Sequence, residues 1–534
     1  MNNSHLFSPS SPLPRPAGAT FHDLYLLVPA FTTILLLSLS GSARMAAGGN
    51  RSRPRLAAAS SRSSARTGLP HVSSAIPWVG HALKLHRDGG RYVDGLIRKT
   101  RQPIFSIDVL SKRLLVIDPS LDRVLAKHAR HTSLIQLIAL VGRRALHLGD
   151  KAIRILNEYD PRPFHAHALS SPQGSLELAE ASVSYLGERF GKQPRVQEVP
   201  LGRWLFEMVA CATARAVWGP ENPWAEDGEF MDQFIILSDE FESLCRPLPS
   251  ITARAAYRAR ELVVGKLVAF HRAHRSARMS SLAHRTNAIY INDADWETNL
   301  DYYKFELIEA LGLLPTASTV SVWLVRYLLV NDELRRKVVD EIRQLKATTG
   351  EDAGRGSALG HLEMSNIRET CPHLVAAWHE TMRLCMTMVP RVASSDFTLT
   401  LPPSCAYPCP PVAGPISIFK HDVVLLPMLS FNLDPKTWGP DAESFRAERF
   451  LDDSGRLRCQ LTQKVRGFGV AGNLCPGRRF GSETALLTVA TLLRDFDVES
   501  ATGAPFPPPP RREAMNFGFD RLGDEVQARL VRIR

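Results

Sequence analysis

The sequence of 534 residues has few cysteines and lacks several patterns that would assign it to a familiar class. Its eight cysteines are irregularly spaced, which argues against a disulfide framework. The segment CAYPC pairs Cys405 with Cys409, but no second pair completes a zinc site, and loop cysteines in a reducing compartment are the simpler interpretation. The chain also has no repeat of fixed period.

The chain has a formal net charge of +11, but its positive residues are scattered and not grouped in a nucleic-acid-binding motif. Neither zinc-finger spacing nor an RNP-like aromatic motif is present, so we expect no nucleic-acid partner. An anionic membrane surface or an acidic protein suits the charge better. The composition, 44% hydrophobic and 22% charged, is that of a globular protein large enough to enclose a sizeable ligand.

Charged residues are absent from Leu24 to Ala43, and the length of this segment suits a bilayer-spanning helix. The basic residues follow it, beginning with Arg44, which favours a cytoplasmic location for the rest of the chain. The alternative, a cleaved signal peptide, would usually have a shorter apolar core and a basic upstream flank. We therefore divide the chain into a tail (1–23), a transmembrane anchor (24–43), a flexible basic linker (44–68) and a folded domain (69–534).

Most of the folded domain has helical periodicity. The β-branched runs of Phe105–Pro119 predict a hairpin. Amphipathic patterns predict helices at Ser175–Arg189, Leu201–Trp218, Glu226–Leu244 and Ile251–Arg275.

A long apolar helix is predicted from Phe305 to Val330, and it contains Pro315. An interior proline removes one helical hydrogen bond and costs about 3 kcal/mol. Pro315 is therefore either a kink without function or the centre of an opened turn that presents Thr316 to a ligand.

Glu380 and Arg383 are three positions apart on a predicted helix, so they share a face. A solvated surface pair is the common reason for such spacing. Their apolar neighbours instead predict a buried ion pair, which needs further polar partners. Arg449, in the downstream segment FRAERF, is a candidate partner.

Near the C-terminus, several glycines surround a single cysteine, Cys475, in the segment KVRGFGVAGNLCPGRRFG. Glycines allow a backbone to approach another group closely. The order of features, from apolar anchor and threonine-bearing helix to ETMR, FRAERF and FGVAGNLCPG, resembles that of the microsomal cytochromes P450. The resemblance extends from about Leu69 to the end of the chain, and it implies a mainly α fold with small β-sheets, preceded by a transmembrane helix.

The resemblance also implies roles for individual residues. Cys475 would be the axial thiolate ligand of the iron of heme b, and such a thiolate pushes electron density onto the metal. Phe468 would pack beside the sulfur, and backbone N–H groups from Gly477 onward would stabilise its negative charge. Thr316 matches the threonine that handles oxygen-derived protons.

By the same resemblance, Glu380, Arg383 and Arg449 would form a structural triad that takes no part in the reaction.

Several residues depart from the family pattern. Ala471 stands where glycine is usual, and Asn473 stands where the family has an arginine that pairs with a haem propionate. Prostacyclin synthases and sterol 7-alpha-hydroxylases also lack that arginine, and the chain looks most similar to fungal secondary-metabolite members near that branch. Ala447 replaces a proline, and Pro315 replaces the acid beside the threonine, which affects ordinary proton delivery.

The resemblance implies a monooxygenase that hydroxylates or epoxidises a lipophilic small molecule, such as a terpenoid, steroid-like or polyketide intermediate. Electrons would come from NADPH through NADPH-cytochrome P450 reductase, with cytochrome b5 as a further candidate donor. The enzyme would be a single-pass protein of the endoplasmic reticulum membrane. A haem-thiolate isomerase or dehydratase that uses no O2 is one alternative, and a membrane-anchored haem-binding protein without catalysis is another.

Two further sets of residues follow from position relative to the family motifs. The first set could form a basic face for an acidic reductase, or could instead contact haem propionates or solvent. It consists of Lys464, Arg466, Arg478 and Arg479. The second set could line the substrate pocket or could belong to the core. It consists of Leu313, Leu314, Val389 and Met515.

Overall fold

The computed structural model describes residues 69–533, apart from 75, 77–78, 110–111, 159–167, 247, 274–298, 346–363, 402–413, 471 and 512–517. The predicted anchor (24–43) and linker (44–68) lie outside the described residues. So do Cys405, Cys409, Ala471 and Met515.

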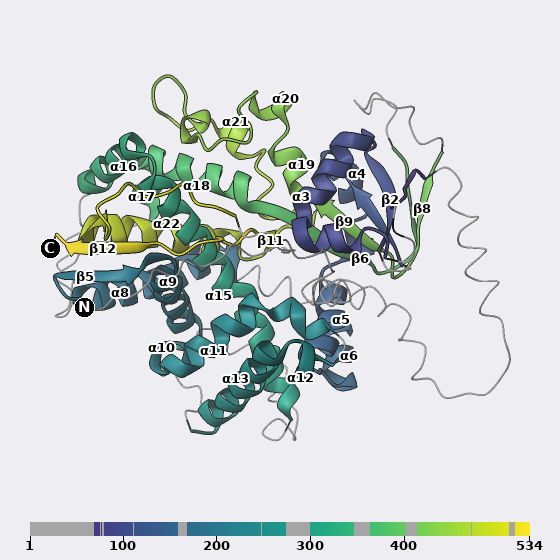
Figure 1. Ribbon diagram of the computed structural model, residues 1–534, viewed down its shortest axis with the longest axis horizontal. Helices are drawn as coiled ribbons and strands as arrows, with labels where there is room; N and C mark the ends of the chain where they lie inside the picture. The colour runs from purple at the N-terminus through teal and green to yellow at the C-terminus, as the bar shows by residue number, and fades with distance from the viewer. Residues whose placement is uncertain are drawn as a thin grey trace, which may run out of the picture.

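The described chain is mainly helical (Figure 1). Its α-helices are α3 (Ala82–Thr100), α4 (Asp122–Ala126), α5 (Ile135–Ala145), α6 (Asp150–Glu158), α8 (Pro172–Gly191), α9 (Leu201–Trp218), α10 (Pro223–Glu226), α11 (Gly228–Asp239), α12 (Pro249–Thr252), α13 (Arg254–Ala273), α15 (Leu300–Leu329), α16 (Asp332–Gln344), α17 (Met364–Thr370), α18 (Pro372–Cys385), α19 (Met428–Asn432), α20 (Pro435–Trp438), α21 (Cys459–Thr462) and α22 (Arg478–Asp495). Short 3-10 turns are η2 (Pro119–Leu121), η3 (Ala129–His131), η4 (Phe241–Cys245) and η5 (Ala447–Phe450).

The strands form one larger and two smaller sheets. They are β1 (His71–Val72), β2 (Ile104–Val109), β3 (Lys112–Ile117), β4 (Thr132–Ser133), β5 (Val196–Pro200), β6 (Met386–Ala393), β7 (Phe397–Leu399), β8 (Ile416–Ile418), β9 (Val423–Pro427), β10 (Phe496–Ser500), β11 (Gly518–Phe519) and β12 (Gln527–Arg532). The 7-stranded sheet has the order β1-β2-β3-β9-β6-β11, with β4 paired to β6, and the smaller sheets are β10-β12-β5 and β7-β8.

Most sequence-predicted elements are present. The predicted hairpin is β2–β3, an antiparallel pair with Phe105 opposite Val116. Helices α8, α9 and α15 match their predicted segments closely. The segment Glu226–Leu244 is instead divided into the end of α10, α11 and η4, because Asp227 caps a new helix by accepting the N–H of Phe230.

The predicted helix at Ile251–Arg275 is also divided, since α12 ends at Thr252 and α13 begins at Arg254.

The longest helix, α15, runs through the middle of the helical region and is packed by α9, α18 and α22 (Figure 1). Asn299 caps it by accepting the N–H of Asp301. Among the described helices, α15 alone is long and apolar enough to cross a membrane, and 61% of its most apolar window is buried within the fold. The apolar side chains that satisfy this criterion therefore form the core of the helical region.

Candidate functional site

The cysteine loop lies between α21 and α22. The backbone N–H of Cys475 donates to the carbonyl oxygen of Phe468 at 2.9 Å, which closes the loop between these two residues. The N–H of Arg478 donates to the carbonyl oxygen of Cys475 at 3.3 Å, so the cysteine directly precedes the first turn of α22. The side chain of Cys475 is exposed, and its sulfur is therefore accessible to a ligand.

Glycines in the loop are required by geometry. Gly469 has φ +87°, and a Cβ there would lie 2.8 Å from the carbonyl oxygen of Asn473. Gly472 has φ +75°, and a Cβ there would lie 2.9 Å from Cβ of Ala129. Other residues are strained in this left-handed region and would also clash, so the loop can lie this close to its neighbours only with glycine.

The surroundings of the Cys475 sulfur affect the pKa of its thiol in opposite directions. Protein atoms crowd around the Cys475 side chain even though it keeps accessible surface, and this desolvation raises the pKa of its thiol. A hydrogen bond from the backbone of Gly477 and the positive charges of Arg478 and Arg391 act in the opposite direction. These groups favour the thiolate, which is the form that binds metals.

The other described cysteines differ from Cys475. Burial raises the pKa of each buried thiol to about 12, and these thiols belong to Cys211, Cys245, Cys371 and Cys385. A thiol of this kind behaves as a small apolar side chain. Cys459 is exposed, on the short helix α21. It therefore provides a natural control for experiments on Cys475.

Arg391, which the sequence analysis did not single out, lies beside the cysteine loop. It belongs to strand β6 and is only 5% exposed. Its guanidinium donates to the carbonyl oxygens of Pro390 at 2.9 Å and Asn473 at 3.3 Å, and its charge acts on the Cys475 thiol. The available signal was a single charged residue within the otherwise uncharged strand MTMVPRVA.

Asn473, which stands where the family pattern has arginine, fastens the loop to η3 and β4. Its side-chain amide donates to the carbonyl oxygen of Ala129 at 3.3 Å and to Oγ1 of Thr132 at 3.2 Å. In this chain, therefore, the side chain of Asn473 anchors the loop to the protein, while the positive charge nearby comes from Arg391.

The structure brings Glu380, Arg383 and Arg449 together in the core. Two nitrogens of Arg383 donate to the two carboxylate oxygens of Glu380, each at 2.7 Å, and both side chains are fully buried. Nε of Arg449 lies 3.4 Å from Oε1 of Glu380. A further nitrogen of Arg383 donates to the carbonyl oxygens of Asn432 and Ala442, both at 2.6 Å.

The buried charges thus have the additional partners that a buried ion pair needs.

Contacts from α18 and α19 connect this triad to the cysteine loop. Asn432 accepts the backbone N–H of Arg466 with its side-chain oxygen, at 3.1 Å, while its carbonyl oxygen binds Arg383. A Cβ on Gly467 would lie 2.6 Å from Cε of Met382, one residue before Arg383 on α18. The loop therefore rests directly on the helix that carries Glu380 and Arg383.

Helix α15 has an accessible face within an otherwise buried stretch. Gly312 and Thr316, one turn apart, are both exposed, and a Cβ on Gly312 would meet nothing within 4 Å. The side chain of Thr316 makes no hydrogen bond with the described residues. Thr316 is therefore free to interact with a ligand.

Of the two interpretations for Pro315, the opened turn is not present. Helix α15 continues through Pro315 from Leu300 to Leu329. Proline has no N–H, so the carbonyl group of Leu311 loses its usual helical donor even though the helix remains continuous. Packing of the surrounding apolar residues maintains the helix.

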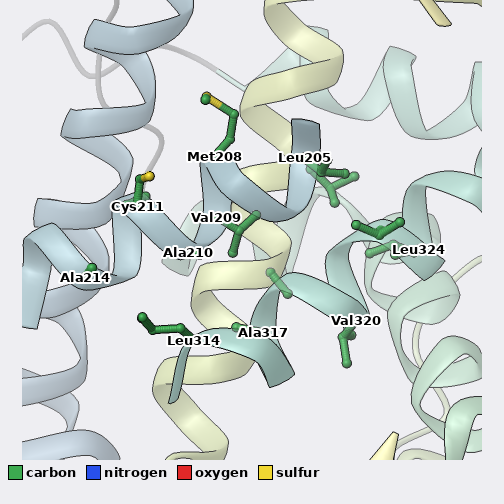
Figure 2. Packing of buried hydrophobic residues seen from close by; sticks show 14 of the residues in the cluster. Leu205, Met208, Val209, Ala210, Cys211, Ala214, Leu314, Ala317, Val320 and Leu324 are labelled. Carbon is green, nitrogen blue, oxygen red and sulfur yellow. The ribbon is translucent and has the colours of Figure 1, made fainter. Parts of the chain in front are cut away.

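The opposite face of α15 packs against α9, and Figure 2 shows this interface. Leu314 and Ala317 of α15 lie there, with Val209 of α9 among the labelled residues of the same cluster. Leu314 is 0% exposed. Of the two interpretations for Leu314, core packing is therefore correct, whereas Leu313 and Val389 are only partly buried and stay candidates for the pocket.

The structure also places Phe468 and the four basic residues near the cysteine loop. Phe468 is partly buried and packs near Trp378, with ring centroids 6.0 Å apart. Of the four basic residues, Arg466 pairs with Asp122 at 2.6 Å and Arg479 with Glu483 at 2.9 Å. The side chains of the other two, Lys464 and Arg478, are exposed.

These features fit a haem with a cysteine ligand. An exposed sulfur receives a backbone hydrogen bond, the glycine loop leaves no room for side chains, and buried Arg391 supplies positive charge for an anionic group. Open space beside Gly312 leaves room next to α15. A haem bound here would supply the activation of oxygen, which no side chain can perform.

Comparisons with known proteins give the family. The model of the cytochrome P450 family matches residues 229–525. The chain is 24% identical over 467 residues to the cytochrome P450 monooxygenase nodJ of Hypoxylon pulicicidum, covering 82% of this chain and 84% of that protein. A cytochrome P450 monooxygenase of Gibberella zeae is 23% identical over 464 residues, covering 83% and 84%.

Among solved structures, the retinoic acid-bound cyanobacterial CYP120A1 has the same fold, with a TM-score of 0.61. It is 20% identical, and the match covers 87% of this chain and 99% of that one.

The fold and the family match define a haem-thiolate enzyme. The chain belongs to the cytochrome P450 family, and it is a P450 monooxygenase that uses haem held by a cysteine thiolate.

Proposed function

We propose that the enzyme inserts one oxygen atom into a lipophilic small molecule, by hydroxylation or epoxidation, with Cys475 as the axial ligand of heme b. The substrate class is a terpenoid, steroid-like or polyketide intermediate of secondary metabolism. The similarity to fungal P450 monooxygenases supports this choice. The observation that carries the proposal is the exposed sulfur of Cys475, with the backbone hydrogen bond from Gly477.

The residues of this chain would divide the work in the following way. Cys475 would hold the iron, and Phe468 would shield the sulfur from water. Arg391 would offer its positive charge to a haem propionate, in place of the arginine that Asn473 replaces. Thr316, on the accessible face of α15, would hold and pass a proton with its hydroxyl group.

The triad of Glu380, Arg383 and Arg449 would act structurally. Its contacts through Asn432 and Met382 support the cysteine loop on the side that faces α18 and α19. The rigidity of this support would fix the orientation of the ligand sulfur.

Electrons would reach the haem from NADPH through NADPH-cytochrome P450 reductase, with cytochrome b5 as a further candidate. The exposed side chains of Lys464 and Arg478 near the loop would contribute to docking an acidic partner. The residues 24–43 would anchor the enzyme in the endoplasmic reticulum membrane, with the catalytic domain in the cytoplasm.

A haem-thiolate isomerase or dehydratase is the second candidate. It is favoured by Pro315, which occupies the position beside Thr316 where the family has an acid. Incubation with reductase, NADPH and isotopically labelled O2 separates the two. Label in the product supports the monooxygenase, and conversion without O2 or NADPH supports the isomerase.

The assignment of the ligand is tested with Cys475→Ala. This variant should lose the carbon monoxide difference spectrum of a thiolate-ligated haem, because it removes the sulfur proposed as the iron ligand. The matched control is Cys459→Ala, which removes the second exposed cysteine of the described residues and should leave the spectrum unchanged. If Cys475→Ala kept the thiolate spectrum and Cys459→Ala lost it, the ligand would be Cys459 and not Cys475.

A further inference from the structure

A cavity of about 830 Å³ lies between α3 and preceding residues of the chain, namely Val72, Ser73, Ser74 and Ile76, with Arg511 and Asp520 also in its lining. It lies in the β-rich part of the molecule, to the right in Figure 1. The residues that form the haem site, from Thr316 to Cys475, do not contribute to its lining. Its size falls within the range of small-molecule sites, roughly 300–1,000 Å³.

The lining combines apolar surface with positive charge. Val72, Ile76, Leu83, Tyr92 and Leu96 supply apolar and aromatic surface. The apolar side chains alone would suit many small molecules. Charge is therefore the property that narrows the class of ligand.

The cations and anions of the lining do not balance. Arg87 pairs with Asp88 at 2.7 Å, and Arg511 pairs with Asp520 at 3.0 Å. The remaining charged side chains of the lining are all positive, and they are Lys84, Arg91 and Lys99.

Among the described residues, these three cations have no carboxylate within ion-pair distance. Lys84 has one aromatic neighbour, the ring of Tyr92, whose centroid is 5.9 Å from Nζ. The three side chains are exposed, so the cavity has a positively charged, solvent-accessible wall without a direct ion pair to these cations.

Arg91 lines the same cavity as a second arginine, Arg511. The pKa of Arg91 is lowered, first by desolvation and then by the charge of Arg511. Nearby carboxylates, including Asp520, act in the opposite direction but do not reverse this shift. An anion bound in the cavity would reduce the repulsion between the two arginines.

We propose that this cavity is a second binding site, separate from the haem site, for an anionic amphiphile with a carboxylate head and an aliphatic chain. The carboxylate would lie near Arg91 and Lys84, and the chain would follow Leu83 and Leu96. Arginine and lysine bind carboxylates through charge-assisted hydrogen bonds, and the apolar wall would bury the aliphatic chain.

The charge also argues against the chain's own basic segment as the occupant. Residues 44–68 contain six arginines and no acidic residue, namely Arg44, Arg51, Arg53, Arg55, Arg62 and Arg66. A segment of this charge would be repelled by the cations of the cavity.

The test uses the full-length haem-loaded protein in a neutral detergent, with excess imidazole bound to the haem iron to block the haem site. Equilibrium dialysis with radiolabelled octanoate should show saturable binding. Octanol, which lacks charge, and octyltrimethylammonium, which has the opposite charge, should compete at least about tenfold more weakly. Acetate, which lacks the chain, should also compete weakly.

Paired variants test the location. Lys84→Ala with Arg91→Ala should weaken octanoate binding by about tenfold or more. The matched control is Lys436→Ala with Arg336→Ala, which removes one exposed lysine and one exposed arginine on α20 and α16 and should leave binding unchanged. An unchanged carbon monoxide spectrum in both pairs confirms that the protein is folded.

Three outcomes would overturn the proposal: equal binding of octanoate and octanol, octanoate binding that survives in Lys84→Ala with Arg91→Ala, and binding that imidazole abolishes. The last result would place octanoate in the haem site. Stronger binding after deletion of residues 44–68 would show that this segment occupies the cavity, and it would also contradict the proposal.

Discussion

The main-chain carbonyl oxygen of Asn432 lies 2.6 Å from Nη1 of Arg383. The side-chain oxygen of the same Asn432 accepts the backbone N–H of Arg466, in the segment that leads into the cysteine loop. One residue therefore connects the buried ion pair to the loop. Damage to the triad is expected to reach the haem ligand by this route.

Replacing Arg383 with lysine should destabilise the protein by about 3–5 kcal/mol, because the carboxylate of Glu380 would lose its bidentate partner in the core. Thermal unfolding and the haem content per chain measure the effect. The control Arg456→Lys alters an exposed ion pair with Asp452 and should change stability by less than about 0.5 kcal/mol. Equal effects of the two substitutions would contradict a structural role for the triad.

Gly469→Ala should lower both stability and haem content. The substitution places a Cβ where φ is +87° and where the carbonyl oxygen of Asn473 is 2.8 Å away. A cost of about 1–3 kcal/mol is expected from the backbone strain. Gly481→Ala, in α22, has open space around its Cβ and should stabilise the helix by about 0.5–1 kcal/mol.

If Gly469→Ala bound haem as fully as Gly481→Ala, the loop would be more adaptable than its geometry indicates.

Thr316→Ala should increase the peroxide released for each NADPH consumed, by about twofold or more, because the accessible hydroxyl group on α15 would be lost. Thr316→Ser keeps the hydroxyl group and should restore coupling. Thr319→Ala, further along the same helix, is the control for helix packing and should behave as the unaltered enzyme. Unchanged coupling in Thr316→Ala would make Thr316 a structural residue.

His379 should make stability depend on pH. Burial lowers its pKa from 6.5 to about 4, with a further contribution from the charge of Arg368. The unfolded chain therefore binds a proton at a higher pH than the folded protein does. Stability from this residue is complete above pH 6.5, falls as the pH decreases toward 4, and is constant below that value.

Denaturant unfolding at a series of pH values should show a loss of about 3 kcal/mol from this residue, which His379→Phe removes. The control His71→Gln replaces an exposed histidine and should keep the slope. An equal slope in His379→Phe would assign the pH dependence to other groups.

Local patterns in the sequence predicted much of the fold. The hairpin at Phe105–Pro119 and helix α9 were predicted because alternation and helical periodicity depend on neighbouring residues. The break at Asp227 was not predicted, since a single capping side chain decides it. The division between α12 and α13 was also missed, although Pro249 begins the short helix α12.

In the site, too, features that depend on neighbouring residues were predicted, and features that depend on distant contacts were not. Cys475 and Glu380 are part of compact motifs, and the structure places Arg383 and Arg449 around Glu380. Arg391 was missed because its importance depends on a contact with Asn473, a residue far along the chain. The inward packing of Leu314 was undecided, since a helix that is apolar on all sides does not indicate which face meets α9.

The position of α15 in the chain has a consequence for topology. Strand β3 precedes α15 and β9 follows it, yet the two strands are hydrogen-bonded in one parallel pair. Hydropathy alone would allow α15 to be counted as a bilayer-spanning segment, which would put β3 and β9 in different aqueous compartments. Paired strands cannot be separated by a lipid barrier, so the protein on both sides of α15 resides in a single compartment.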